Sequence, residues 1–243
     1  MAELVIGLPR IEGAVERLGG ELRELLSSYN SIALPLPRGL CRDLIYRGVG
    51  ALDDDLIDIS LKYFNTSLTR VWWSVIKEIP RLAVEMPHRE VICYEEDIDP
   101  RSLEVNAYRL ASLLIRARIS LSGRIDPRPW IEFFKPVGKG FPRISGSDVI
   151  VADGYVRYKE ILDLMEHRIA RKLWRLIPTP LEILEMIAKG YLDESWAHDA
   201  VKFSVRYLGD YVIGSRDLTE AYERLLSDRE YLDFLASIGL FDP

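Results

Sequence analysis

The chain has 243 residues, of which 48% are hydrophobic and 29% are charged, a composition typical of soluble globular proteins. The formal net charge of -6 argues against broad electrostatic capture of nucleic acid and leaves only a local basic groove as an alternative. The sequence contains no apolar run of about 18 residues and no signal-peptide pattern, so we expect a cytoplasmic protein without a membrane association.

Two further features of the composition concern cysteine and amide residues. Cys41 and Cys93 are too few for a disulfide framework, and we expect both to behave as small buried apolar side chains. Gln is absent and Asn occurs only at positions 30, 65 and 106, a scarcity of thermolabile amides that fits a thermophile.

Short apolar segments in the first two thirds of the chain predict buried parallel strands, because helical patterns follow them. The predicted strands are 3–8, 32–36, 90–94 and 148–152, and residues 126–136 form a further strand, fourth in chain order, or a packed loop. Pro35 lacks an amide donor, so it should lie at a strand end or on an edge strand. The predicted helices are 11–26, 39–47, 53–64, 67–82, 103–121, 156–177, 181–189, 192–212, 218–226 and 231–238.

This order of elements predicts an α/β fold. We expect a mostly parallel four- to five-stranded sheet flanked by helices, followed by an all-helical C-terminal region. The two parts divide near the Pro178-Thr-Pro180 stop, which gives an α/β domain over 1–178 and a helical region over 179–243.

Ligands of open parallel sheets bind beyond the carboxyl ends of the strands, where loops converge. Six candidate ligand-binding residues should lie at that edge: Arg10, Glu95, Glu96, Asp97, Asp153 and Tyr155. The carboxylates at 95–97 form a cluster that could hold a divalent cation. The alternative, which we favour, is that the acidic residues from Glu95 to Asp99 cap the following helix and that Asp153 caps the next.

Other metal and phosphate signals are weak. His88, His167 and His198 have no zinc-site spacing, so we predict no metal centre and no cofactor. P-loop, dinucleotide and nucleophile-elbow motifs do not occur. Lys139 lies in a glycine-rich segment that is either a flexible basic loop or a lid that closes on an anion.

The order of three short motifs resembles the TraB/TIKI/ChaN-like superfamily. These motifs are Gly7-Leu-Pro-Arg10, Leu34-Pro-Leu-Pro37 and Val151-Ala-Asp-Gly-Tyr155. The resemblance implies an ancestry among metalloproteases and haem-binding proteins, whose first and last motifs end in His and whose middle motif carries an acidic residue.

This chain departs from the family at the positions that would bind metal. Arg10 and Tyr155 stand where the family has His, and Pro35 or Leu36 replaces the acidic residue. A protonated guanidinium cannot ligate a metal as a neutral imidazole does. The resemblance therefore implies a degenerate, non-catalytic relative.

We therefore favour a binding or scaffold protein, with a small anionic ligand or a protein as partner. An apolar stripe in the tail could dock on the sheet domain or form a homodimer through the C-terminal helices: Trp196, Phe203, Tyr207 and Tyr211. The alternative is an enzyme acting on a phosphorylated or anionic small molecule, with Arg10 and Lys139 holding the anion, Glu95 or Asp153 as general base, and Tyr155 as proton donor. A third hypothesis is nucleic-acid binding through the basic helix predicted at 156–177.

Overall fold

A computed structural model describes residues 2–47, 50–97, 99–120, 125–135, 144, 146–164 and 169–241. The chain forms two compact units, each of which is made from two segments of the sequence. The first unit comprises Met1–Val105 and Gly140–Leu176, and the second comprises Asn106–Lys139 and Ile177–Pro243. The predicted division at 178 and 179 stays a prediction, and these units differ from it in grouping residues 106–139 with the tail.

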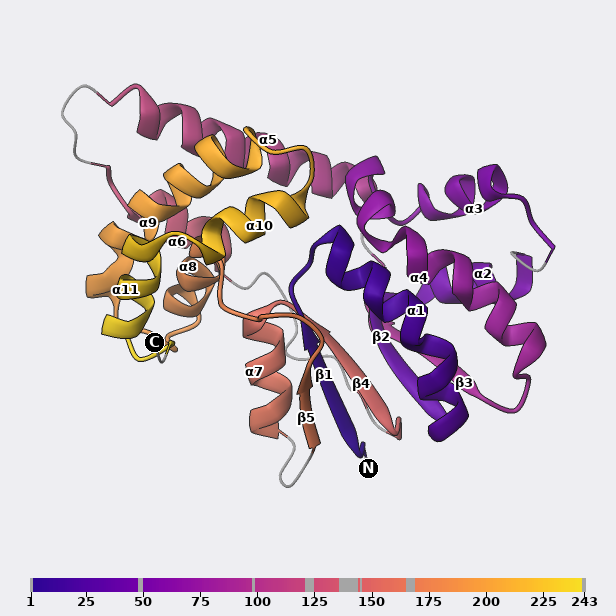
Figure 1. The fold of residues 1–243 in the computed structure, drawn as a ribbon. Helices are drawn as coiled ribbons and strands as arrows, with labels where there is room; N and C mark the ends of the chain where they lie inside the picture. Colours follow the sequence, from indigo (N-terminus) through magenta and orange to yellow (C-terminus); the bar gives the residue numbers. More distant parts are fainter. Residues whose placement is uncertain are drawn as a thin grey trace. The chain divides into compact units, whose positions relative to one another are not determined.

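The first unit is built on a five-stranded, entirely parallel sheet with the strand order β3-β2-β4-β1-β5 (Figure 1). This sheet and the helical C-terminal region confirm the predicted α/β fold class. The strands are β1 (Leu4–Leu8), β2 (Ser31–Pro37), β3 (Glu90–Glu95), β4 (Val149–Asp153) and β5 (Ile169–Lys172).

The three central strands are buried at every residue, which explains their continuous apolar sequences. Neighbouring Val5, Ile150 and Ala33 share one face of the sheet and pack with Tyr158 of α7 (Tyr155–Leu164). β3 and β5 form the edges, and both expose part of their length. Buried apolar side chains on the central strands therefore define the core of this unit.

Helices α1 (Glu12–Ser28) and α4 (Thr66–Glu85) pack against each other in the first unit (Figure 1). Gly19 brings the two helices together, since a Cβ there would lie 2.9 Å from Cβ of Ser74. The Ser74 hydroxyl donates a 3.0 Å hydrogen bond to the carbonyl of Val15. Two shorter helices, α2 (Arg38–Arg47) and α3 (Asp53–Ser60), complete the connection between β2 and β3.

Strands β2 and β4 separate toward their carboxyl ends. β2 pairs with β4 only at Ile32 and Ala33, and its register with β3 shifts between Leu34 and Pro37. Pro35 and Pro37 supply no amide hydrogen, so β2 cannot continue a regular ladder there. Pro35 thus lies in an interior strand and not on an edge, but beyond the last residue that pairs with β4.

A side-chain hydrogen bond links β3 to β4 in this part of the sheet, where the ladder between β2 and β4 has ended. The Tyr94 hydroxyl, from β3, donates a 2.7 Å hydrogen bond to the carbonyl of Val151 in β4. The connection after β2 leads to β3 on one side, whereas the connection after β4 leads to β5 on the other. Chain connections that diverge between neighbouring parallel strands leave a crevice at the carboxyl edge.

Two predicted elements are wrong. The helix predicted over 156–177 ends at Leu164, and β5 follows, because residues 169–172 pair with the otherwise free edge of β1. The candidate strand at 126–136 is instead helix α6 (Arg128–Phe134), with Pro127 at its N-cap and Trp130 and Ile131 buried. Proline in the first turn of a helix removes no hydrogen bond that the helix would otherwise form.

The two cysteines form a disulfide between α2 and β3, so the prediction of unpaired apolar side chains is wrong. The Cα atoms of Cys41 and Cys93 lie 5.9 Å apart, within the usual range for a disulfide. The positions are 52 residues apart, and no spacing rule connects two cysteines so distant in sequence.

The second unit is helical in its described residues. Its core contains an aromatic cluster in which Phe203 stacks on Phe234 with ring centroids 5.0 Å apart and meets Tyr231 at 5.2 Å. The Tyr222 hydroxyl donates to the carbonyl of Ile177 and accepts from its amide, both at 2.9 Å. The helices are α5 (Pro100–Arg118), which belongs to this unit from Asn106 onward, α6, α8 (Pro180–Ala188), α9 (Ala197–Arg206), α10 (Leu218–Leu226) and α11 (Arg229–Ser237), with a 3-10 turn at Glu194–Trp196 and a π-helical turn at Tyr207–Val212.

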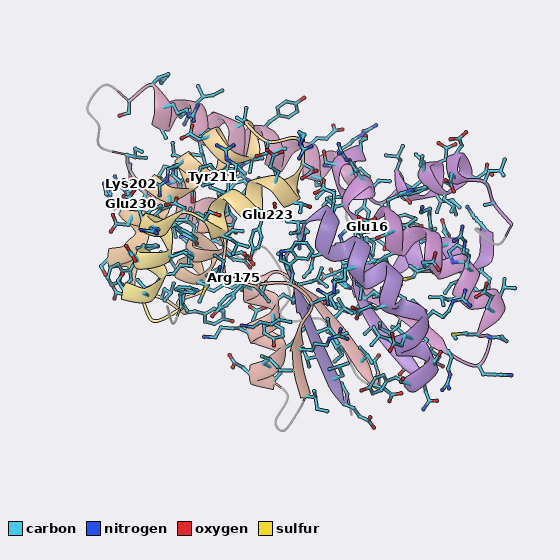
Figure 2. The ribbon with its side chains drawn as sticks, in the orientation of Figure 1. Glu16, Arg175, Lys202, Tyr211, Glu223 and Glu230 are labelled. Carbon is cyan, nitrogen blue, oxygen red and sulfur yellow. A yellow bond between two sulfur atoms is a disulfide. The ribbon has the colours of Figure 1, made fainter. Side chains whose placement is uncertain are left out.

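The apolar stripe of the tail is used inside this unit. Phe203 and Tyr207 are buried, and Trp196 meets Phe234 edge to face. On the surface, Lys202 and Glu230 point toward each other and form a 2.9 Å ion pair between α9 and α11 (Figure 2). A homodimer through these helices stays a prediction, but the stripe that suggested it packs within the protomer.

Among the described residues, no helix has the length and apolar character needed to cross a membrane.

Candidate functional site

A small cavity of about 150 Å³ lies at the carboxyl edge of the sheet, where β2 and β4 separate. The lining of the cavity combines charged residues with apolar and aromatic ones. The charged lining residues are Arg10, Glu95, Glu96, Asp153 and Arg157. The apolar and aromatic lining residues are Pro35, Pro37, Tyr63, Phe64, Leu68, Trp72 and Leu103.

Arg10 and Asp153 form the first of two ion pairs in this pocket. The strand register places Leu8 opposite Asp153, so Arg10 emerges beside the end of β4. The Arg10 Nε donates a 2.5 Å hydrogen bond to Oδ2 of Asp153, whose side chain is only 5% exposed. Gly154 makes the turn into α7 with a φ of 89°, and its amide donates to the carbonyl of Leu8 at 2.8 Å. A left-handed backbone favours glycine at that position.

Glu95 and Arg157 form the second ion pair. The Arg157 Nη2, from the first turn of α7, donates a 2.9 Å hydrogen bond to Oε1 of Glu95 at the end of β3. Burial raises the pKa of Glu95 above its ordinary value; the Arg157 charge opposes this shift and the Asp153 charge adds to it. The pocket therefore contains a carboxyl group that is partly desolvated and held in place.

The apolar and aromatic lining residues form what we call the aromatic wall. It is fixed by contacts between α2 and the segment that follows α3. Tyr63 donates a 3.0 Å hydrogen bond to Asp43, and burial, followed by this bond, raises the pKa of Tyr63. A Cβ at Gly39 would lie 2.5 Å from Cε1 of Tyr63 and 2.6 Å from Oδ2 of Asp97. Glycine at 39 thus allows the ring and the carboxylate to approach the same turn of backbone.

The predicted site residues divide into three groups. Arg10, Glu95, Glu96 and Asp153 line one pocket, as the carboxyl-edge argument predicts. Asp97 and Tyr155 do not line it: Asp97 accepts the amide hydrogen of Gly39 at 2.7 Å, and Tyr155 packs against the core on the α7 side. Lys139 lies outside the described residues.

The capping interpretation of the acidic residues is mostly wrong. Glu95 and Asp153 face arginines, and Asp97 binds the start of α2 and not of its own following helix. Asp99 is the exception, since its carboxylate accepts the amide hydrogen of Arg101 at the start of α5. The side chains therefore serve long-range contacts that helix-start preferences do not anticipate.

No three His, Cys, Asp or Glu side chains converge as a metal-binding group in the part of the chain that the structure describes. Glu95 and Asp97 are engaged by Arg157 and Gly39, which places their carboxylates on different partners. The divalent cation at 95–97 stays a prediction that this geometry does not support.

Arg157 and the apolar and aromatic residues are the parts of the pocket lining that the sequence did not indicate. Arg157 follows β4 by four positions, so the same carboxyl-edge argument could have found it. Tyr63, Leu68 and Trp72 come from the long excursion between β2 and β3, and only the folded chain brings them to this edge.

The parallel sheet, its two buried faces and the diverging connections define an open α/β protein with a pocket at the carboxyl edge of its sheet. Comparison with protein-family models, curated proteins and solved structures found no match for this chain. The resemblance to the TraB/TIKI/ChaN-like superfamily therefore stays a prediction.

Proposed function

We propose that this protein binds a small organic molecule in the pocket at the carboxyl edge of the sheet. The observation that supports this function most directly is the joining of two ion pairs and an aromatic wall around one cavity of about 150 Å³. A mostly apolar cleft with a few fixed polar groups is the usual form of a small-molecule site. A dry cavity of this volume in another protein accommodates benzene, so we expect a ligand of roughly six to eight non-hydrogen atoms.

The pocket supports binding more than catalysis. Arg10 holds Asp153, and Arg157 holds Glu95, so both candidate bases already have cationic partners. Tyr155, the predicted proton donor, packs away from the lining. We therefore keep the binding hypothesis first and the degenerate-relative interpretation with it.

An enzyme is the second candidate because of one observation. Glu95 lines the pocket with its pKa raised by burial, and partly desolvated carboxyl groups are common among general acids and bases. A substrate that displaced Arg157 would release Glu95 for proton transfer. Turnover of a bound compound that Glu95→Gln abolishes without loss of binding would favour this candidate.

A pocket-filling variant tests the binding function. Leu68→Trp adds a large ring to a half-buried lining residue, and Leu164→Trp adds the same ring to an exposed position outside the lining. We expect small aromatic fragments to shift the NMR signal of the Trp72 indole in the wild type and in Leu164→Trp, and to have no effect in Leu68→Trp. Equal binding to all three proteins would contradict a site in this pocket.

A further inference from the structure

The pocket contains more carboxylates than guanidinium groups. Arg10 and Arg157 are its cations, and Glu95, Glu96 and Asp153 are its anions. Each guanidinium already pairs with a lining carboxylate, at 2.5 Å for Arg10 and 2.9 Å for Arg157, and Arg157 also forms a 3.7 Å ion pair with Glu160 outside the lining. Glu96 has neither a hydrogen-bond nor an ion-pair partner among the residues that the structure describes. The formal charge left over at this site is negative.

This charge balance disfavours an anionic ligand. An anion that bound Arg10 would approach the charge of Asp153, whose side chain is 5% exposed and cannot turn into solvent. An anion that bound Arg157 would separate it from the partly buried Glu95. Repulsion by Asp153 in the first case, and the loss of the cation of Glu95 in the second, both oppose the binding of an anion.

A cationic group has the opposite effect. An ammonium group beside Glu96 would neutralise the excess charge while both ion pairs stay intact. The rest of the ligand would lie against the aromatic and proline wall, which includes Tyr63 and Trp72. Aromatic rings also attract ammonium groups through their electron-rich faces.

We propose that the pocket binds small primary amines with an apolar body, with Glu96 as the carboxylate that receives the ammonium group. This inference rests on the proposed function, and it replaces the small anionic ligand expected from the sequence with a cationic one. It follows from the charge balance of the pocket and from the ion pairs that already occupy both arginines.

Three probes of nearly the same shape test the sign of the charge: benzylamine, benzyl alcohol and benzoate. We expect benzylamine to bind at least about tenfold more tightly than benzoate at neutral pH, because opposite charge at close range favours one partner over the other. Binding is measured by calorimetry and by titration of the Trp72 indole signal in NMR spectra of the full chain.

Two variants that each remove one negative charge test whether Glu96 is the carboxylate that binds the ammonium group. Glu96→Gln should weaken benzylamine about three- to tenfold and leave benzyl alcohol unchanged, as expected for a partly exposed charged contact. Glu24→Gln removes the same charge from an exposed position on α1 outside the lining and should change neither. Thermal unfolding of both variants establishes that each remains folded.

The outcomes separate this inference from the proposed function. Benzoate or benzyl alcohol binding as tightly as benzylamine, with Trp72 perturbed, would overturn the amine class and support a small-molecule site. Equal benzylamine affinity in Glu96→Gln and the wild type would overturn the role of Glu96. If none of the three probes binds and a wider fragment set also fails to perturb Trp72, both proposals are wrong.

Discussion

Gly7 offers the sharpest test of how the sheet and α7 hold the charged edge of the pocket. A Cβ added at Gly7 would lie 2.5 Å from Cδ2 of Tyr158 and 2.8 Å from Cδ2 of Leu176. Carbon atoms in contact normally lie about 3.5 to 4.0 Å apart, so the added methyl group overlaps the Tyr158 ring by about 1 Å. Tyr158 and Leu176 belong to a buried cluster that offers the ring little room to move.

Gly7→Ala should therefore destabilise the protein. Overpacking a well-filled core costs about 1 to 3 kcal/mol, and the loss of glycine's freedom in the unfolded chain returns about 0.5 to 1 kcal/mol. The expected net loss is about 1 to 2 kcal/mol in the free energy of unfolding, equivalent to about 2 to 8 °C in Tm for a chain of this size. Urea unfolding, followed by circular dichroism, measures it.

The matched control is Gly20→Ala in α1. A Cβ at Gly20 meets no atom within 4 Å, so alanine there should stabilise the helix by about 0.5 to 1 kcal/mol. Tyr158→Leu in the Gly7→Ala background should restore part of the lost stability, because the two sites are in contact. Equal or higher stability of Gly7→Ala relative to the wild type would refute the close packing of β1 against α7.

Three further predictions concern the disulfide, a buried cap and a titrating carboxyl group. Reduction of the Cys41–Cys93 disulfide, whose residues are 52 positions apart, should lower the free energy of unfolding by about 4 kcal/mol in the chain-entropy estimate. An unchanged urea midpoint in dithiothreitol would contradict this expectation. So would an effect of the reductant that persists when both cysteines are replaced by serine. Asp228→Ala should lower the free energy of unfolding in urea by about 2 to 3 kcal/mol, because the Asp228 carboxylate is 7% exposed, caps α11 and accepts hydrogen bonds from two further side chains. The control is Asp199→Ala at an exposed position, and an equal loss in both variants would be the contrary result. Burial raises the pKa of Glu95 above its ordinary value of 4.5 in the folded protein. The contribution of Glu95 to the free energy of unfolding is therefore fully favourable below pH 4.5 and is lost as the pH rises through the folded pKa. Glu95→Gln should remove that decline, and identical pH profiles of the urea midpoint in the variant and the wild type would count against it.

Four of the five strands in the described sheet could be predicted, because each is defined by its own residues. Apolar runs such as 4–8 and 149–153 are buried on both faces, so their composition alone indicates a central parallel strand. β5 could not be predicted in this way, since residues 169–172 are mostly exposed and become a strand only by pairing with the free edge of β1. The same dependence on tertiary contacts explains α6, whose Trp130 and Ile131 suit a strand or a helix equally.

The charged half of the pocket could be predicted for a topological reason. Arg10, Glu95 and Asp153 each lie at or just after the end of a strand, and parallel strands bring their ends to one edge. The partners of these side chains could not be predicted, because register and helix position decide whether a carboxylate caps a helix or meets an arginine. Tyr63 and Trp72 required the folding of the whole excursion between β2 and β3.

The separation of β2 from β4 has a consequence for the binding function that we propose. Pro35 and Pro37 have no amide hydrogens, so β2 and β4 cannot form a continuous hydrogen-bonded ladder there, even when the cavity is empty. The opening is preorganised by backbone chemistry, so little conformational entropy is lost when a guest enters. Substitution of single side chains at the rim of the pocket would then change its selectivity for ligands without changing the width of its opening.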